Sequence, residues 1–286
     1  MKIGLRKNSQ WRDVWHRLKK NRMAMFGLAV LILLVLLAIF ADFIAPYGVD
    51  EQNYSEMLQS PSLRHPMGTD NFGRDIMSRI IYGTRISLLI GFISLLISAV
   101  VGSILGACAG YFSGISDTII MRGADILMAI PRTVLAIAIA TTLGPGLVNA
   151  MIAVAIGTIP SFARVVRAST LTVKDQEYVE AARAIGASNT HIIAKYIFPN
   201  VLAPIIVQAT LGVATAILLA ASLSFLGIGI EPPTPEWGSM LSAARSYIRD
   251  YWYMVTFPGL AIMVTVLALN LFGDGLRDAL DPKLKK

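Results

Sequence analysis

Long stretches without a charged residue dominate the hydrophobic pattern of this chain. Crossing a hydrocarbon core about 30 Å thick takes roughly 20 helical residues, and each stretch is about that long or longer. None alternates as the strands of a membrane barrel do, and a spanning helix satisfies its own backbone hydrogen bonds. We therefore expect membrane-spanning helices in these stretches, which cover residues 23–41, 86–116, 133–163, 196–230 and 251–273.

Turn residues and charges set the number of helices at six. Gly144-Pro145-Gly146 interrupts one apolar stretch, so that a helix ends before it and another begins after it. The pattern then predicts an all-α membrane protein with six transmembrane helices. The expected helices cover residues 25–45, 86–110, 118–142, 147–163, 201–228 and 252–272.

The basic residues indicate how these helices are oriented. Only 15% of the residues are charged, against roughly 25% in soluble domains, and the net charge is +7. Lys and Arg cluster at the ends of the apolar stretches and form no single patch, which argues against nucleic-acid binding. The six-helix topology places 18 of them on the side of the N-terminus and 6 on the other, with Arg132 inside a span. The positive-inside rule then predicts that both termini are cytoplasmic.

The chain is expected to consist of four parts, the first of which is a basic N-terminal segment. Residues 1–22 carry eight Lys or Arg and one Asp, with Trp11 and Trp15 between them, as in an interfacial helix. The apolar stretch that follows is too long for a signal peptide, so we expect it to be retained. The predicted parts are a cytoplasmic amphipathic segment (1–24), a first helix (25–45), an extracytoplasmic segment (46–85) and a five-helix core (86–286) with a polar cytoplasmic loop (164–199).

Residues 177–200 of this loop have the sequence EYVEAARAIGASNTHIIAKYIFPN. Strong helix formers surround Glu180, and Gly186 can end their helix in a left-handed turn. Ser188 or Asn189 can cap a second helix that ends before Pro199. Such a hairpin would suit a partner's groove, or else pack only on its own chain. Its expected apolar contacts are Ala181, Ile185 and Ile192.

The stretch resembles the EAA loop of bacterial ABC-importer permeases. That pattern is EAA, three residues, Gly, nine residues and I-x-L-P; here Tyr196 and Phe198 replace its Ile and Leu. The resemblance implies that the loop couples the permease to a separate ATPase. The residues it assigns to coupling are Glu180, Ala181, Ala182, Arg183, Gly186 and Pro199.

Three other segments resemble the C-type permease of dipeptide, oligopeptide and nickel importers: residues 21–47, 65–88 and 231–241. The resemblance implies a type I ABC importer permease fold in a prokaryotic inner membrane. It also implies three kinds of partner: a second homologous permease, two ABC ATPase subunits and an extracytoplasmic substrate-binding protein. It implies peptide import, with nickel or another small solute as the alternative. No Walker A sequence occurs, so we expect no enzyme activity and no cofactor on this chain, with ATP and Mg²⁺ on the ATPase subunits.

Residues within the spans suggest further roles. Gly102, Gly106 and Gly110 lie on one helix face, which favours close helix packing over a gate. Arg122 and Asp125 are three residues apart, so we expect them to pair, as a structural clamp or a substrate contact. Arg132 is expected to line the translocation path or to reach the membrane surface. The single cysteine and three scattered histidines predict no metal site.

Two other classes of protein fit parts of the pattern. A secondary transporter should show inverted repeats and polar broken helices, and we find no convincing repeat. A membrane scaffold without a pore is the second alternative.

Overall fold

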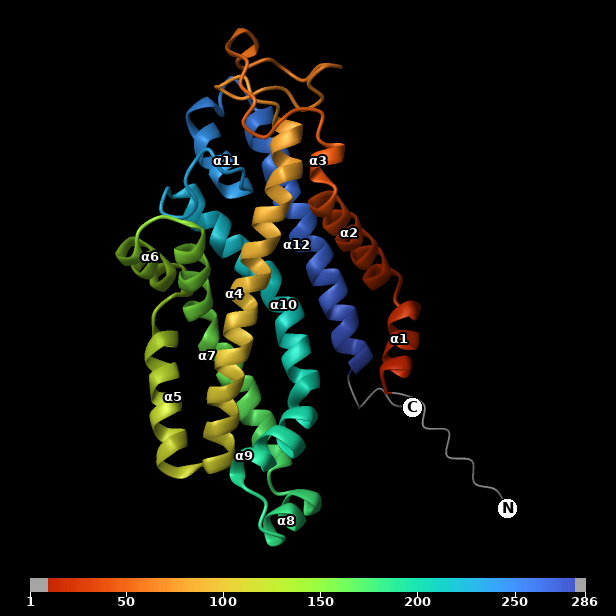
Figure 1. Ribbon diagram of the computed structural model, residues 1–286, viewed down its shortest axis with the longest axis vertical. Coiled ribbons are helices and arrows are strands. Elements are labelled where there is room, and N and C mark those ends of the chain that lie inside the picture. Colours follow the sequence, from red (N-terminus) through yellow and green to blue (C-terminus); the bar gives the residue numbers. More distant parts are fainter. Residues whose placement is uncertain (1–9, 281–286) are drawn as a thin grey trace, which may run out of the picture.

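Five long apolar helices lie side by side, roughly along the long axis of the protein (Figure 1). The structure is a computed structural model and describes residues 10–280, which contain helices and no extended strand. The five helices are each long and apolar enough to cross a membrane. They are α2 (Arg22–Ile39), α4 (Ile76–Phe112), α7 (Leu147–Val173), α10 (Phe198–Phe225) and α12 (Tyr253–Leu280).

The predicted helix over 118–142 is wrong as a single helix. The structure has α5 (Gly114–Ala129) and α6 (Arg132–Leu143), bent by 93° at the break between them. Pro131 explains the break, because proline disfavours helical geometry in the residue before it, and Ile130 is extended. Counted as one broken span, the pair makes the sixth transmembrane element.

Four other helices extend eight or more residues beyond their predicted bounds, and one of them is α12, which ends at Leu280. α4 begins ten residues early because Asp75 caps it, accepting a hydrogen bond from the Ser78 amide at 2.7 Å. α7 continues ten residues into the polar loop. α9 (Asn189–Ile192), a π-helical turn (Ile193–Ile197) and α10 form one continuous helix.

The expected helix end before Pro199 is therefore wrong. Proline lacks an N–H group and would break the regular ladder of an α-helix. The wider π turn lies just before it, and the Phe198 amide bonds to the Ile193 carbonyl oxygen across that turn. The helix continues through Pro199, because the π turn directly before it accommodates a residue that has no N–H group to donate.

Shorter elements lie at the two ends of the bundle. One end carries α8 (Glu177–Ala184). Residues 46–75, which we call the cap, lie at the other end beside α11 (Trp237–Ala244) (Figure 1). The remaining elements are α1 (Gln10–Lys20), α3 (Ala41–Ile44) and two 3₁₀ turns, Tyr54–Glu56 and Arg245–Tyr247.

The bundle is closest where α4 meets α7. A Cβ atom on Gly102 would lie 2.7 Å from the Ile159 carbonyl oxygen, and one on Gly106 would collide with that of Ala163. On Gly110 it would lie 3.0 Å from the Arg167 carbonyl oxygen. These three glycines let the two backbones touch, which small residues permit between membrane helices.

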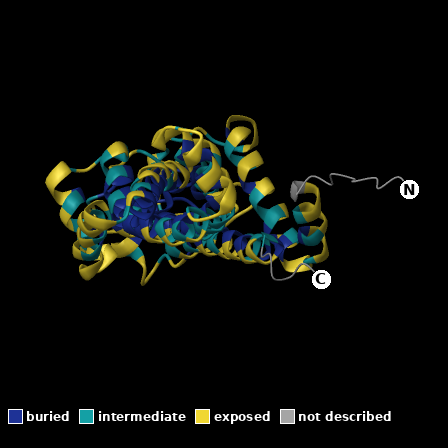
Figure 2. Cartoon of the chain, turned by 90° about the horizontal axis from the view of Figure 1, so that it is seen from below, coloured by how far each residue is buried: buried dark blue, intermediate teal, exposed yellow. Residues whose placement is uncertain are grey.

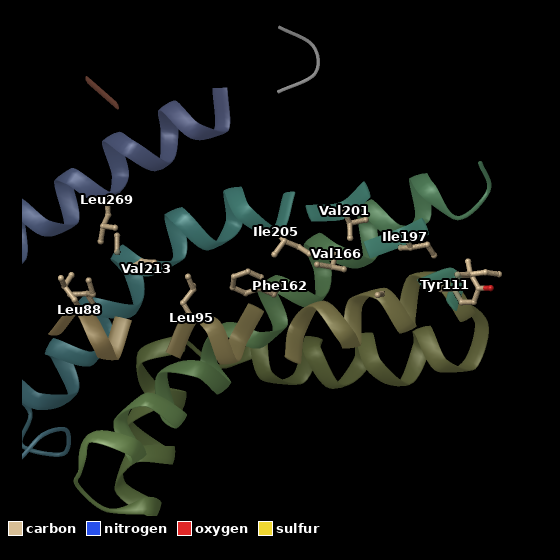
Figure 3. Packing of buried hydrophobic residues seen from close by; sticks show 14 of the residues in the cluster. Leu88, Leu95, Tyr111, Phe162, Val166, Ile197, Val201, Ile205, Val213 and Leu269 are labelled. Atoms are coloured by element: carbon tan, nitrogen blue, oxygen red, sulfur yellow. The ribbon is translucent and has the colours of Figure 1, made fainter. Parts of the chain in front are cut away.

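A core of apolar side chains continues from this contact into the neighbouring helices. Leu95, Phe162, Val166 and Ile205 belong to one buried cluster shared by α4, α7 and α10 (Figure 3). Viewed along the bundle, buried residues lie in the centre and exposed ones outside (Figure 2). Many of the exposed residues on α2 and α4 are large and apolar, which suits contact with lipid acyl chains.

A buried carboxylate caps α11, and the neighbouring tryptophan ties this helix to α4 at the cap end. Glu236 is 1% exposed and accepts hydrogen bonds from the Gly238 and Ser239 amides at 2.9 and 2.8 Å. The adjacent Trp237 is fully buried, and its Nε1 donates to the Ile80 carbonyl oxygen. Burial raises the pKa of the Glu236 carboxyl, although the two amide donors act in the opposite direction.

We expect Gly106→Ala to lower the free energy of unfolding by about 1–3 kcal/mol, because the new methyl group would push α7 away from α4. Thermal unfolding of the purified protein in detergent measures the change. Gly123→Ala is the matched control, since a Cβ atom on Gly123 in α5 meets nothing within 4 Å. Equal midpoints for the two variants would contradict the close contact.

We expect Glu236→Ala to cost about 1–3 kcal/mol of stability, since it leaves two buried amide donors unpaired. Glu236→Gln keeps an acceptor oxygen. Because the folded-state pKa of Glu236 is raised, its contribution is greatest at acidic pH and declines as the pH rises. Wild type should therefore lose stability relative to the Gln variant, which does not titrate, from pH 4 to pH 8 in thermal unfolding, and an unchanged difference would refute this.

Candidate functional site

The α8 end of the molecule carries a helical hairpin that extends beyond the long helices (Figure 1). We call residues 177–192 the coupling hairpin; it consists of α8, a short turn and α9. Gly186 has a φ of +81° and ends α8 in the predicted left-handed turn. Ser188 then caps α9, its hydroxyl accepting a hydrogen bond from the His191 amide, so this local prediction is confirmed.

One side of the hairpin is anchored to its own chain. Val179 and Ala182 are buried in the main core, together with Ile192. Tyr111, near the end of α4, donates a hydrogen bond to Asn189 Oδ1 at 2.9 Å, and the Arg183 guanidinium lies 5.5 Å from the Tyr111 ring centroid. The expectation that Ile192 is available to a partner is wrong, because it is an anchor.

The other side of the hairpin is exposed. Ile185 is 82% exposed and Tyr178 is 42% exposed, which is unusual for large apolar side chains outside a bilayer. Glu180 and Ala181 are exposed beside them. Of the residues assigned to coupling, only Ala182 is buried; the exposed ones are Glu180, Ala181, Arg183, Gly186 and Pro199.

Ion pairs hold α5 against α7 near the same end. Asp125 pairs with Arg164 at 2.6 Å, and Asp117 is bound by both Nε and Nη2 of Arg167. The predicted pair between Arg122 and Asp125 is wrong: Asp125 faces α7, and Arg122 is exposed without an ion pair among residues 10–280. Sequence spacing along one helix could not reveal partners 39 and 50 positions away.

Arg132 lies at the bend between α5 and α6. It begins α6, it is exposed, and its Nη2 donates to Ser161 Oγ on α7 at 2.5 Å. This contact ties the bend to α7. Its predicted place on the translocation path stays a prediction.

The described residues offer no group of three or more His, Cys, Asp or Glu side chains placed to hold a metal ion. At the α8 end the structure shows an exposed tip with large apolar side chains and a buried base that packs against α4.

Sequence comparison identifies the class of protein to which this framework belongs. Residues 100–286 match the family described as binding-protein-dependent transport system inner membrane component. Residues 9–61 match the N-terminal transmembrane domain of oligopeptide transport permease C.

The chain belongs to the first of these families. It is a multi-pass inner-membrane permease subunit of the ABC importer class. The dipeptide transport system permease protein of Alkalihalophilus pseudofirmus is 50% identical over 277 residues, covering 97% of this chain and 91% of the relative. The di/tripeptide permease protein of Pseudomonas aeruginosa is 47% identical, with 97% and 93% covered. The glutathione transport system permease protein of Escherichia coli is 49% identical, with 96% and 91% covered.

Solved structures agree on the fold of this permease. A chain of the inward-facing MetNI methionine ABC transporter gives a TM-score of 0.57 at 20% identity, covering 72% of this chain and 98% of that one. A chain of an amino acid ABC transporter gives 0.54 at 16% identity, covering 71% and 94%. The type I importer permease fold expected from the sequence is thus confirmed.

We expect Gly186→Ala to loosen the coupling hairpin. No atom lies within 4 Å of the added methyl group, so its effect is backbone strain of about 1–2 kcal/mol from a left-handed conformation. Proteolysis within residues 184–190 should accelerate about 5–30-fold in the purified protein. Gly186→Asn is the control, because asparagine tolerates this conformation, and equal cleavage of both variants would contradict the explanation.

Proposed function

We propose that this permease pairs with a second, homologous permease to form a path for di- and oligopeptides, and that two ABC ATPase subunits drive it. An extracytoplasmic substrate-binding protein delivers the peptide, and ATP and Mg²⁺ bind the ATPase subunits. One observation carries the proposal: the coupling hairpin is exposed at its tip and anchored at its base.

The covalent and hydrogen-bonded connections of the hairpin support a coupling role. Three residues separate the end of α7 at Val173 from the start of α8, and α9 continues into α10. Tyr111 adds the end of α4 through its bond to Asn189. A push on the tip is therefore delivered to three spanning helices at once. Closing of the ATPase pair would in this way swing the helices between inward-open and outward-open states.

The ion pairs to α5 extend this moving unit. Asp117 and Asp125 hold α5 to Arg167 and Arg164 of α7, so α5 follows α7. The bend at Pro131 then separates α5 from α6, which packs on α7 by buried alanines such as Ala136. We propose that this bend lies next to the path and that Arg132 contributes to its lining.

The orientation and substrate follow from different observations. The excess of Lys and Arg favours a cytoplasmic α8 end with both termini on that side, and an extracytoplasmic cap.

The curated relatives are named for dipeptides, di/tripeptides and glutathione, all short peptides. Their similarity over nearly the whole chain favours short peptides over nickel or another small solute.

A variant at the hairpin tip tests the proposal. We expect Ile185→Glu to reduce co-purification of the ATPase subunits and peptide-dependent ATP hydrolysis by tenfold or more, since a carboxylate replaces the most exposed apolar group of the tip. Folding should be unaffected, because Ile185 is exposed and belongs to no buried cluster within residues 10–280.

Leu63→Glu is the matched control for this test. Leu63 is fully exposed in the cap, so the same change of charge occurs at the opposite end of the molecule. ATPase co-purification should survive it. Intact co-purification and ATP-driven uptake in the Ile185 variant would refute docking at this tip.

A further inference from the structure

A histidine is enclosed between two carboxylates in the cap. His65 is 2% exposed, and its Nδ1 lies 2.9 Å from Asp75 Oδ1. Its other ring nitrogen, Nε2, points to Glu56 Oε2 at 3.6 Å. Tyr47 stacks on the ring with centroids 4.8 Å apart, so the imidazole is fixed in this orientation.

The hydrogen bonds of Asp75 decide which nitrogen of a neutral ring carries the proton. The Asp75 carboxylate is buried and accepts bonds from the amide and hydroxyl of Ser78 at the start of α4. Because an ionised carboxylate only accepts, Nδ1 must be the donor to Asp75. In the neutral ring Nε2 is then an acceptor that faces a second carboxylate, and it has no hydrogen-bond partner among the described residues.

A second proton on the ring removes this conflict. Nε2–H can then donate to Glu56, and the imidazolium lies between two anions. The other charged or polar groups at Glu56 are Arg64, which forms an ion pair with it, and Asn53, whose Nδ2 donates to Oε2 at 2.7 Å. Glu51 lines the same small cavity of the cap. The charged groups that line this cavity with His65 are therefore three carboxylates, those of Glu51, Glu56 and Asp75, and one arginine, Arg64.

We propose that His65 is a proton-operated clamp of the cap. When the ring is protonated it bonds Glu56 on one side and Asp75 on the other, and it fastens the 3₁₀ turn that ends at Glu56 to the start of α4. When the ring loses its proton the bond to Glu56 is lost and this part of the cap loosens. The stabilisation therefore requires the protonated ring, and raising the pH works against it.

Hydrogen exchange of the full-length protein in lipid nanodiscs, measured at pH 5.5 and 7.5 and corrected for intrinsic rates, tests the clamp. Amides of residues 53–70 should exchange at least about tenfold faster at pH 7.5 than at pH 5.5, the effect of one charge-assisted hydrogen bond. Glu56→Gln should abolish most of this difference, since it removes the anion but keeps the shape and an acceptor for Asn53.

Two further variants make the result decisive. His16→Gln changes an exposed histidine of α1 and should keep the full difference between the two pH values. His65→Gln cannot take up a proton and should show the same protection at both values. The clamp is refuted if wild type shows no difference, or if Glu56→Gln retains it. Neither readout depends on transport, so failure here would leave the proposed import function standing.

Discussion

The contact between the backbones of α4 and α7 is the constraint on which the rest of the structure depends. Glycines at positions 102, 106 and 110 bring α7 so close that its carbonyl groups occupy the space of missing side chains. The bilayer provides no hydrophobic force between helices, so close van der Waals packing of this kind must hold them together. Helices α5, α6 and α10 and the coupling hairpin are all positioned by one of these two helices.

Charged side chains stabilise the two ends of the bundle in different ways. At the α8 end, two aspartates of α5 pair with arginines of α7, and these charged side chains remain partly exposed. At the cap end, buried carboxylates cap the N-termini of two helices: Asp75 caps α4 and Glu236 caps α11. Charged groups are thus concentrated at the two ends of the bundle. They are partly exposed at the α8 end and buried at the cap end.

Much of this arrangement could be predicted from local sequence. Apolar length predicted the spans, Gly186 predicted the left-handed turn, and the spacing of the EAA-like residues predicted an exposed hairpin. Prediction failed where distant segments decide the outcome. Asp125 pairs with Arg164 and not with Arg122, because α7 packs beside α5. Ile192 is buried because it packs in the core with the end of α4. The bend at Pro131 and the absence of one at Pro199 show that a proline's effect depends on the turn before it.

That turn has a consequence for how the hairpin is aimed. A π turn holds one residue more than an α turn, and each residue of an α-helix turns the chain by about 100°. The five residues Ile193–Ile197 therefore set the rotation of the hairpin about the axis of α10. One residue fewer in this short stretch would leave every anchor and every exposed group chemically intact, yet would point the tip toward a different neighbour.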